Sequence, residues 1–170
     1  MVDLPRRSYI LAKRQKVIDN WATIIERGAG RDTWFLGEVE KMVIDADMTG
    51  LRSSQMNVQS GIFGQARPFL VVSLERLRKH TMFIGARDFG AHLDISWFVT
   101  LYQGRIENFL FGKSANNPRL RMTVFSQQDL SAFTFVVHRC VLEAARMLME
   151  ELSLDPTGMN TKSNGFLSVW

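Results

Sequence analysis

The chain has 170 residues, of which 46% are hydrophobic and 22% charged, a composition that excludes a disordered chain and is typical of one globular domain. Its single cysteine, Cys140, excludes an internal disulfide and a cysteine-based metal site. The net charge of +4 is a weak indication of an anionic partner.

The first part of the chain predicts two helices. In residues 8–27 hydrophobic side chains recur at helical spacing, and Ser8 can cap the first turn. A loop with two glycines follows, and a second hydrophobic stripe fills residues 32–50. We therefore expect a helical hairpin over residues 1–50.

After Gly50 the hydrophobic pattern changes from helical spacing to alternation, which is typical of half-buried strands. Turn residues separate the segments, and the separations are too short for crossover helices. Residues 51–125 therefore predict an antiparallel meander of about five or six strands. The expected strands cover residues 52–61, 69–74, 81–88, 92–102, 105–112 and 119–125.

The clearest helical pattern lies in residues 126–155, where Ser126 can act as the N-cap of a helix with one long apolar stripe. Such a helix can cover a whole sheet face. The sequence predicts a single α+β domain over residues 1–155, in which this helix packs on one face of the sheet. Residues 156–170 follow as a polar linker with an apolar end.

The stretch GARDFGAHLDISWFV, residues 85–99, predicts a hairpin with two different faces. With a loop from Asp88 to Ala91, Ala86 faces Leu93 and Ile84 faces Ile95 on an apolar face that belongs to the core. Arg87, His92, Asp94 and Ser96 then share the opposite face. Trp97 should accordingly be buried and Asp94 accessible to solvent.

These polar side chains have two interpretations. Strict alternation on a half-exposed sheet explains them without any function. Alternatively they form a site in which His92 is a base or ligand, Asp94 orients it and Arg87 binds an anion. The sequence offers no partner nucleophile and no third metal ligand at motif spacing, so we expect neither a metal nor a cofactor. Phe89, in the hairpin loop, is expected to be a contact residue.

Two basic segments are candidates for contacts with nucleic-acid phosphates, while aromatic side chains of the sheet could stack on bases. The first segment contains Arg6, Arg7, Lys13, Arg14 and Lys16, and the second contains Arg76, Arg78 and Lys79.

The C-terminal tail ends in four large apolar residues, Phe166, Leu167, Val169 and Trp170. A free end with this much apolar surface is unfavourable, so we expect it to dock. It is either a final strand of its own sheet or a segment that adds to the sheet edge of a neighbouring chain.

Taken together, these patterns favour a non-enzymatic binding or assembly module that acts through a sheet face, the Phe89 loop or the C-terminal tail. A protein partner or self-association as a homo-oligomer is expected. A nucleic-acid-binding protein that uses residues 6–16 and 76–79 is one alternative, and an enzyme with a site of His92, Asp94 and Arg87 is a second. We expect a cytoplasmic protein without a membrane span, because no apolar run reaches ~20 residues and no signal peptide is visible.

Overall fold

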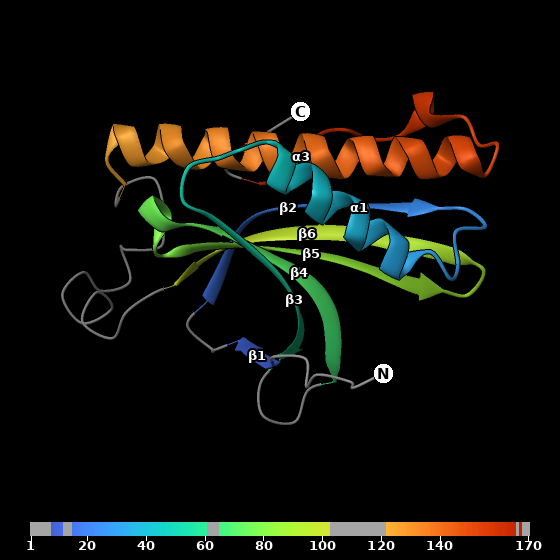
Figure 1. Cartoon of the computed structure of the whole chain (residues 1–170), viewed down its shortest axis with the longest axis horizontal. Helices are drawn as coiled ribbons and strands as arrows, with labels where there is room; N and C mark the ends of the chain where they lie inside the picture. The colour runs from blue at the N-terminus through green and yellow to red at the C-terminus, as the bar shows by residue number, and fades with distance from the viewer. Residues whose placement is uncertain (1–7, 12–14, 61–64, 103–121, 166, 168–170) are drawn as a thin grey trace.

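The computed structural model describes residues 8–11, 15–60, 65–102, 122–165 and 167. It has two layers, a curved sheet and two helices that lie on one face of it (Figure 1). The helices are α1 (Asp32–Asp45) and α3 (Val124–Glu151). The expected α+β fold, with an antiparallel sheet and a long C-terminal helix, is confirmed. Among the described residues, no helix is long and apolar enough to cross a membrane.

Five antiparallel strands make up most of the sheet, in the spatial order β3-β4-β5-β6-β2. They are β2 (Gln15–Ile25), β3 (Leu51–Ser60), β4 (Ala66–Leu74), β5 (His80–Phe89) and β6 (His92–Tyr102). The four strands from β3 to β6 form the expected meander. A short strand, β1 (Ser8–Leu11), pairs with β3 in parallel.

The core fills the space between the sheet and the two helices. Trp21 of β2 and Trp97 of β6 pair directly with each other, and both are 0% exposed. Burial of one large apolar side chain contributes about 1.5–3 kcal/mol, so this layer dominates the stability of the fold. The helices supply Phe35, Val39, Val43, Leu130, Val137, Val141 and Leu148.

Residues 15–25 form strand β2, so the first predicted helix, and with it the helical hairpin over residues 1–50, is wrong. The second helix, expected over residues 32–50, is confirmed as α1. Ile18, Trp21 and Ile25 are buried at a spacing that also fits a helix. The segment is nevertheless rich in β-branched residues, which favour strands. A β-bulge between Val17 and Asp19 interrupts the alternation and hides the strand pattern.

The predicted start of the long helix is also wrong. Thr123 is the N-cap, and its hydroxyl accepts a hydrogen bond from the Ser126 amide at 3.1 Å. Val124 and Phe125 belong to the helix and are each 79% exposed. The last residues of the strand expected at 119–125 are therefore helical. The strand expected at 105–112 lies outside the described residues.

The β5–β6 hairpin is confirmed, but its register differs by two residues from the expected one. Arg87 faces Asp94 directly and Ala86 faces Ile95, so only Gly90 and Ala91 remain for the turn. Gly90 has a φ of 62°, and the positive value at the first turn position alone is the pattern of a type II′ turn. A shift by two preserves the faces: Trp97 is buried, as expected, and the Asp94 side chain is 20% exposed.

Candidate functional site

The face of the sheet opposite α1 and α3, called here the helix-free face, carries its side chains in rows across the strands. The register gives three rows near the β5–β6 turn: Phe69, Gly85, Ser96 and Ala22; then Arg87, Asp94 and Ile24; then Phe89 and His92. At the other end of this face, Phe83 and Thr100 are only 2% and 3% exposed. The accessible part of the face is therefore its end near the turn.

A groove of about 550 Å³ lies on this accessible part and is called the face groove here. This is the size range of ligand sites. Phe69, Phe98 and Gly85 contribute apolar surface, and Arg67 and Arg87 contribute positive charge. Its other lining residues are Ala22, Gln65, Ala66, Pro68, Ala86, Asp94 and Ser96.

Gly85 gives the face groove part of its shape. A Cβ atom at this position would lie only 2.7 Å from the Phe69 ring, so the ring can lean over the strand only because the residue is glycine. Phe69 also packs edge-on against Phe83, with ring centroids 6.4 Å apart. These contacts hold the aromatic wall in place.

The structure brings Arg87 and Asp94 together but gives His92 a different role. Arg87 Nε donates a hydrogen bond to an Asp94 carboxylate oxygen at 2.7 Å. His92 Nδ1 instead accepts a hydrogen bond from the backbone amide of Arg27 at 3.4 Å. Among the described residues, no group of three His, Cys, Asp or Glu side chains could hold a metal ion.

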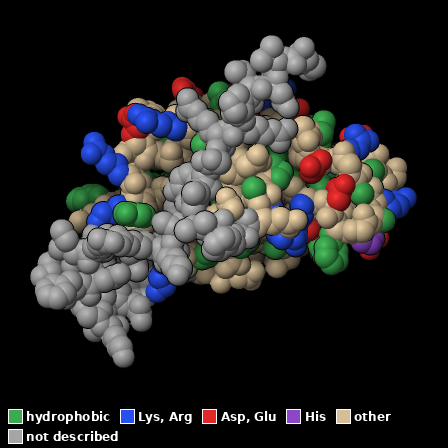
Figure 2. Space-filling model, turned by 90° about the horizontal axis from the view of Figure 1, so that it is seen from below, with side chains coloured by type: hydrophobic (Ala, Val, Ile, Leu, Met, Phe, Trp, Pro, Cys, Tyr) green, Lys and Arg blue, Asp and Glu red, His purple; other side chains and the backbone are tan. Residues whose placement is uncertain are grey.

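Two apolar side chains extend the accessible surface beyond the face groove. Phe89 is 61% exposed, with the Arg87 guanidinium 6.0 Å from its ring centroid. Ile24 of β2 is 57% exposed and pairs with Asp94. Figure 2 views this side of the molecule, and its coloured atoms show hydrophobic side chains among basic and acidic ones.

The structure describes only half of the residues proposed for nucleic-acid contacts. Arg6, Arg7, Lys13 and Arg14 lie outside the described residues, and Lys16 is in β2. Arg76, Arg78 and Lys79 lie around the 3-10 helix η1 (Glu75–Leu77), where Arg76 is 3.7 Å from Asp129.

The described part of the C-terminal tail packs in cis on β2 and α3. The Asn164 amide donates to the Asn20 carbonyl at 2.8 Å, and the Leu167 amide donates to the Asp19 carboxylate at 2.9 Å. The bulge turns Asp19 toward the helix side, where it is 0% exposed. Leu167 packs against the core. Phe166, Val169 and Trp170 lie outside the described residues.

His138 of α3 links this tail to the core, a role that the sequence pattern does not indicate. Its Nδ1 accepts a hydrogen bond from Trp97 Nε1 at 2.9 Å, so the proton is on Nε2, which donates to the Thr161 carbonyl at 2.7 Å. Burial lowers the pKa of His138, and the neutral ring fits both contacts. In addition, Trp21 Nε1 donates to the Asn160 carbonyl at 2.7 Å.

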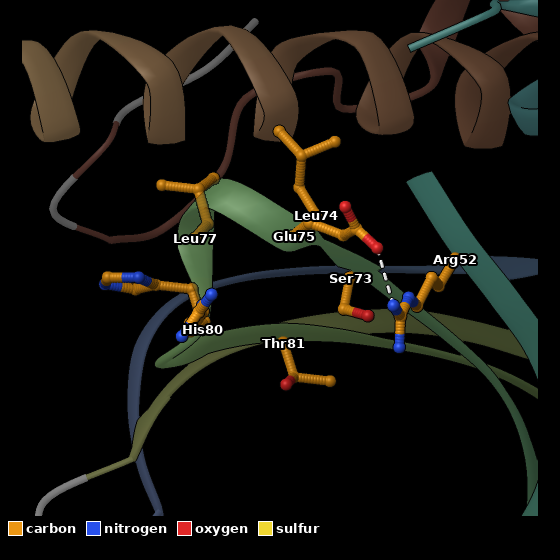
Figure 3. A pocket seen from close by; sticks show the side chains of 8 residues that line it. Arg52, Ser73, Leu74, Glu75, Leu77, His80 and Thr81 are labelled. Atoms are coloured by element: carbon orange, nitrogen blue, oxygen red, sulfur yellow. Dashed lines mark hydrogen bonds and ion pairs between the residues drawn. The ribbon is translucent and has the colours of Figure 1, made fainter. Parts of the chain in front are cut away.

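A second cavity, of about 470 Å³, lies at the corner where β4, η1 and β5 meet, and is called the corner cavity here. In Figure 3, Ser73 and Thr81 lie between His80 at one end and the Arg52–Glu75 ion pair at the other. Leu74, Leu77 and Arg78 complete its lining. His80 also lines a neighbouring cavity of about 280 Å³, together with Arg76, Lys79 and Ser126.

His80 is the unusual group of the corner cavity. It is 7% exposed, and its Nε2 atom is buried without a hydrogen-bond partner among the described residues. Burial, with a smaller effect of the Lys79 charge, lowers the pKa of His80 from 6.5 to about 4. Sequence reasoning missed this residue because it follows the basic run at 76–79, which is typical of a solvated edge.

Cys140 lies half-buried against the core, and burial raises the pKa of its thiol, so its environment does not favour the reactive thiolate.

Comparison of the chain with models of protein families, with curated proteins and with solved structures finds no match.

Proposed function

We propose that the protein is a non-enzymatic binding module that uses the helix-free face of its sheet to hold a segment of a protein partner. The observation that carries the proposal is the face groove, whose accessible surface continues to Phe89 and Ile24. Proteins seldom leave contiguous apolar surface exposed unless it serves an interaction. A surface that extends beyond one groove favours a peptide segment over a compact small molecule.

Charge complementarity indicates the chemistry of the partner. Arg67 is exposed at the face groove, and no described residue forms an ion pair with it. Arg87 also lines the face groove, but its charge is partly compensated by the ion pair with Asp94. We therefore infer an acidic segment that places an aromatic or aliphatic side chain against Phe69 and Phe98.

The experiment selects random peptides on the full chain by phage display and measures the affinity of the selected peptide by calorimetry. We expect acidic peptides with at least one large apolar residue. Arg67→Glu should weaken binding by about tenfold or more, as expected for reversing a charge in a binding site. The matched control Lys41→Glu makes the same change of charge on exposed Lys41 of α1 and should leave the affinity unchanged.

Two results would overturn the proposal. Equal loss of affinity in both variants would mean that the peptides respond only to net charge. Alternatively, light scattering could show a dimer that Arg67→Glu disrupts, and the occupant of the helix-free face would then be a second copy of the chain.

A further inference from the structure

The corner cavity has properties of a ligand site that differ from those of the face groove. A buried polar atom in a folded protein nearly always has a hydrogen-bond partner. His80 Nε2 has none in the part of the chain that the structure describes, although it is shielded from water. Leaving such a group unsatisfied costs about 1–3 kcal/mol. A cost of this kind is common at binding sites, where the missing partner arrives with the ligand.

The groups around His80 indicate what that partner is. Arg78 is exposed at the cavity, and no ion pair joins it to a described residue. The hydroxyls of Ser73 and Thr81 line the same space and form no hydrogen bond with a described residue. Hydroxyls, a neutral imidazole N–H and a guanidinium can all donate hydrogen bonds. A cluster of donors with a surplus of positive charge favours an oxyanion.

The charge balance supports the same ligand chemistry. Arg52 also lines the cavity, where Glu75 compensates it with an ion pair of 2.5 Å. Arg76 and Lys79 line the neighbouring cavity, which shares Arg78 and His80 with the corner cavity. The carboxylate of Asp129 lies 3.7 Å from the Arg76 guanidinium. Arg78 therefore supplies positive charge that the cavity itself does not neutralise.

We propose that the corner cavity binds a phosphate group carried by a small molecule, with Arg78 as the counter-charge and His80, Ser73 and Thr81 as hydrogen-bond donors. The volume of about 470 Å³ leaves room for the rest of a small ligand beside the phosphate. Because His80 Nε2 is shielded from water, the side chains that cover it must move when the ligand binds. This site shares no lining residue with the face groove.

The test uses inorganic phosphate as the probe and follows the imidazole nitrogens by NMR at constant ionic strength. The chain has three histidines, so each ring can be assigned. We expect a saturable shift of the His80 signals, while those of His138, which already has two partners, remain unchanged. Arg78→Gln should weaken phosphate binding by about tenfold, and the control Lys41→Gln should leave it unchanged.

Substitution of His80 separates a ligand site from a structural role. His80→Leu should abolish phosphate binding measured by calorimetry without lowering the melting temperature, because it removes an unsatisfied group and keeps a similar volume. Absence of a saturable His80 shift in the unmodified protein would overturn the proposal, and so would binding that survives both Arg78→Gln and His80→Leu. If a single-stranded oligonucleotide binds with a steep salt dependence and displaces phosphate, the corner instead contacts a polynucleotide backbone.

Discussion

His138 and His80 are both buried imidazoles, yet their surroundings differ in one respect. His138 has a partner on each ring nitrogen, one from the sheet and one from the C-terminal tail. His80 has no partner for Nε2 in the described parts of the chain, and it lines two cavities. Burial lowers the pKa of both rings, so both favour the neutral form. Burial and a shifted pKa alone therefore do not distinguish a structural histidine from one that is available to a ligand.

The distinction comes from the satisfaction of polar atoms. Around His138, the indole N–H groups of Trp21 and Trp97 and the carboxylate of Asp19 all have partners. Removing one of these groups leaves another without its partner, which is costly in a buried place. Around His80 the cost is already present, so removing the imidazole should cost little.

The largest effect is expected at Trp97, which is 0% exposed and donates to His138. Trp97→Ala creates a cavity in the core and leaves His138 Nδ1 without its donor. We expect a loss of about 3–5 kcal/mol in the free energy of unfolding, measured by urea titration. A loss below about 1 kcal/mol would show that this part of the core is not packed as described.

The direct test of the contrast compares His138→Leu with His80→Leu. The first leaves the Trp97 indole N–H and the Thr161 carbonyl unpaired, and we expect a loss of about 2–4 kcal/mol. The second should change the stability by less than about 1 kcal/mol, or increase it. Urea titrations at neutral pH measure both. If both variants lose the same free energy of unfolding, the two histidines contribute equally to stability, and the contrast between a structural His138 and an available His80 is wrong.

Asp19 tests how firmly the tail is held. Its buried carboxylate accepts hydrogen bonds from the Leu167 amide and the Ser163 hydroxyl. Asp19→Ala should lower the stability by about 1–3 kcal/mol and speed hydrogen exchange at the Leu167 amide. Asp45→Ala, at an exposed position at the end of α1, is the control. Unchanged exchange at Leu167 would mean that the tail is held without this carboxylate.

His80 also predicts how the stability of the protein depends on pH. The pKa of His80 is about 4 in the folded chain and 6.5 in the unfolded one. Between these values the unfolded chain binds a proton that the folded chain does not, so stability decreases as the pH falls from 6.5 to about 4. His80→Leu lacks this contribution. The free energy of unfolding of His80→Leu minus that of the unmodified protein should be about 2 kcal/mol more positive at pH 5 than at neutral pH. A constant difference between the two proteins would contradict the burial of His80.

The parts of the fold that the sequence predicted are those in which local pattern and burial agree. In β5 and β6 apolar and polar residues alternate, and this assigns Trp97 to the core and Asp94 to the helix-free face whatever the exact turn. The apolar stripe of α3 likewise follows the helical period. Strand β2 could not be predicted in this way, because its bulge at Ile18 produces a helical spacing by coincidence.

The sites were less predictable than the fold, because they depend on pairs that are distant in the sequence. Gly85 shapes the face groove only through Phe69 of another strand. His80 is buried at a corner where η1 meets the residues at the start of α3. Arg78, Phe89 and Arg87 were singled out from sequence as contact or anion-binding residues. No local pattern indicated that His80 would be buried without a partner.

The smallest effect is expected at Asp94, on the opposite side of the same strand as Trp97. Asp94 forms an ion pair with Arg87, whose side chain is 47% exposed, and partly exposed pairs contribute about 0–1 kcal/mol. Asp94→Ala should therefore leave the stability nearly unchanged in urea titrations. It also frees the charge of Arg87 within the face groove, so the affinity for an acidic peptide should rise by a few-fold. Ser96→Ala, in the same strand and the same groove, removes no charge and serves as the control. If Asp94→Ala lowers the affinity instead, the carboxylate itself contacts the partner, and the proposed acidic segment is the wrong ligand for this face.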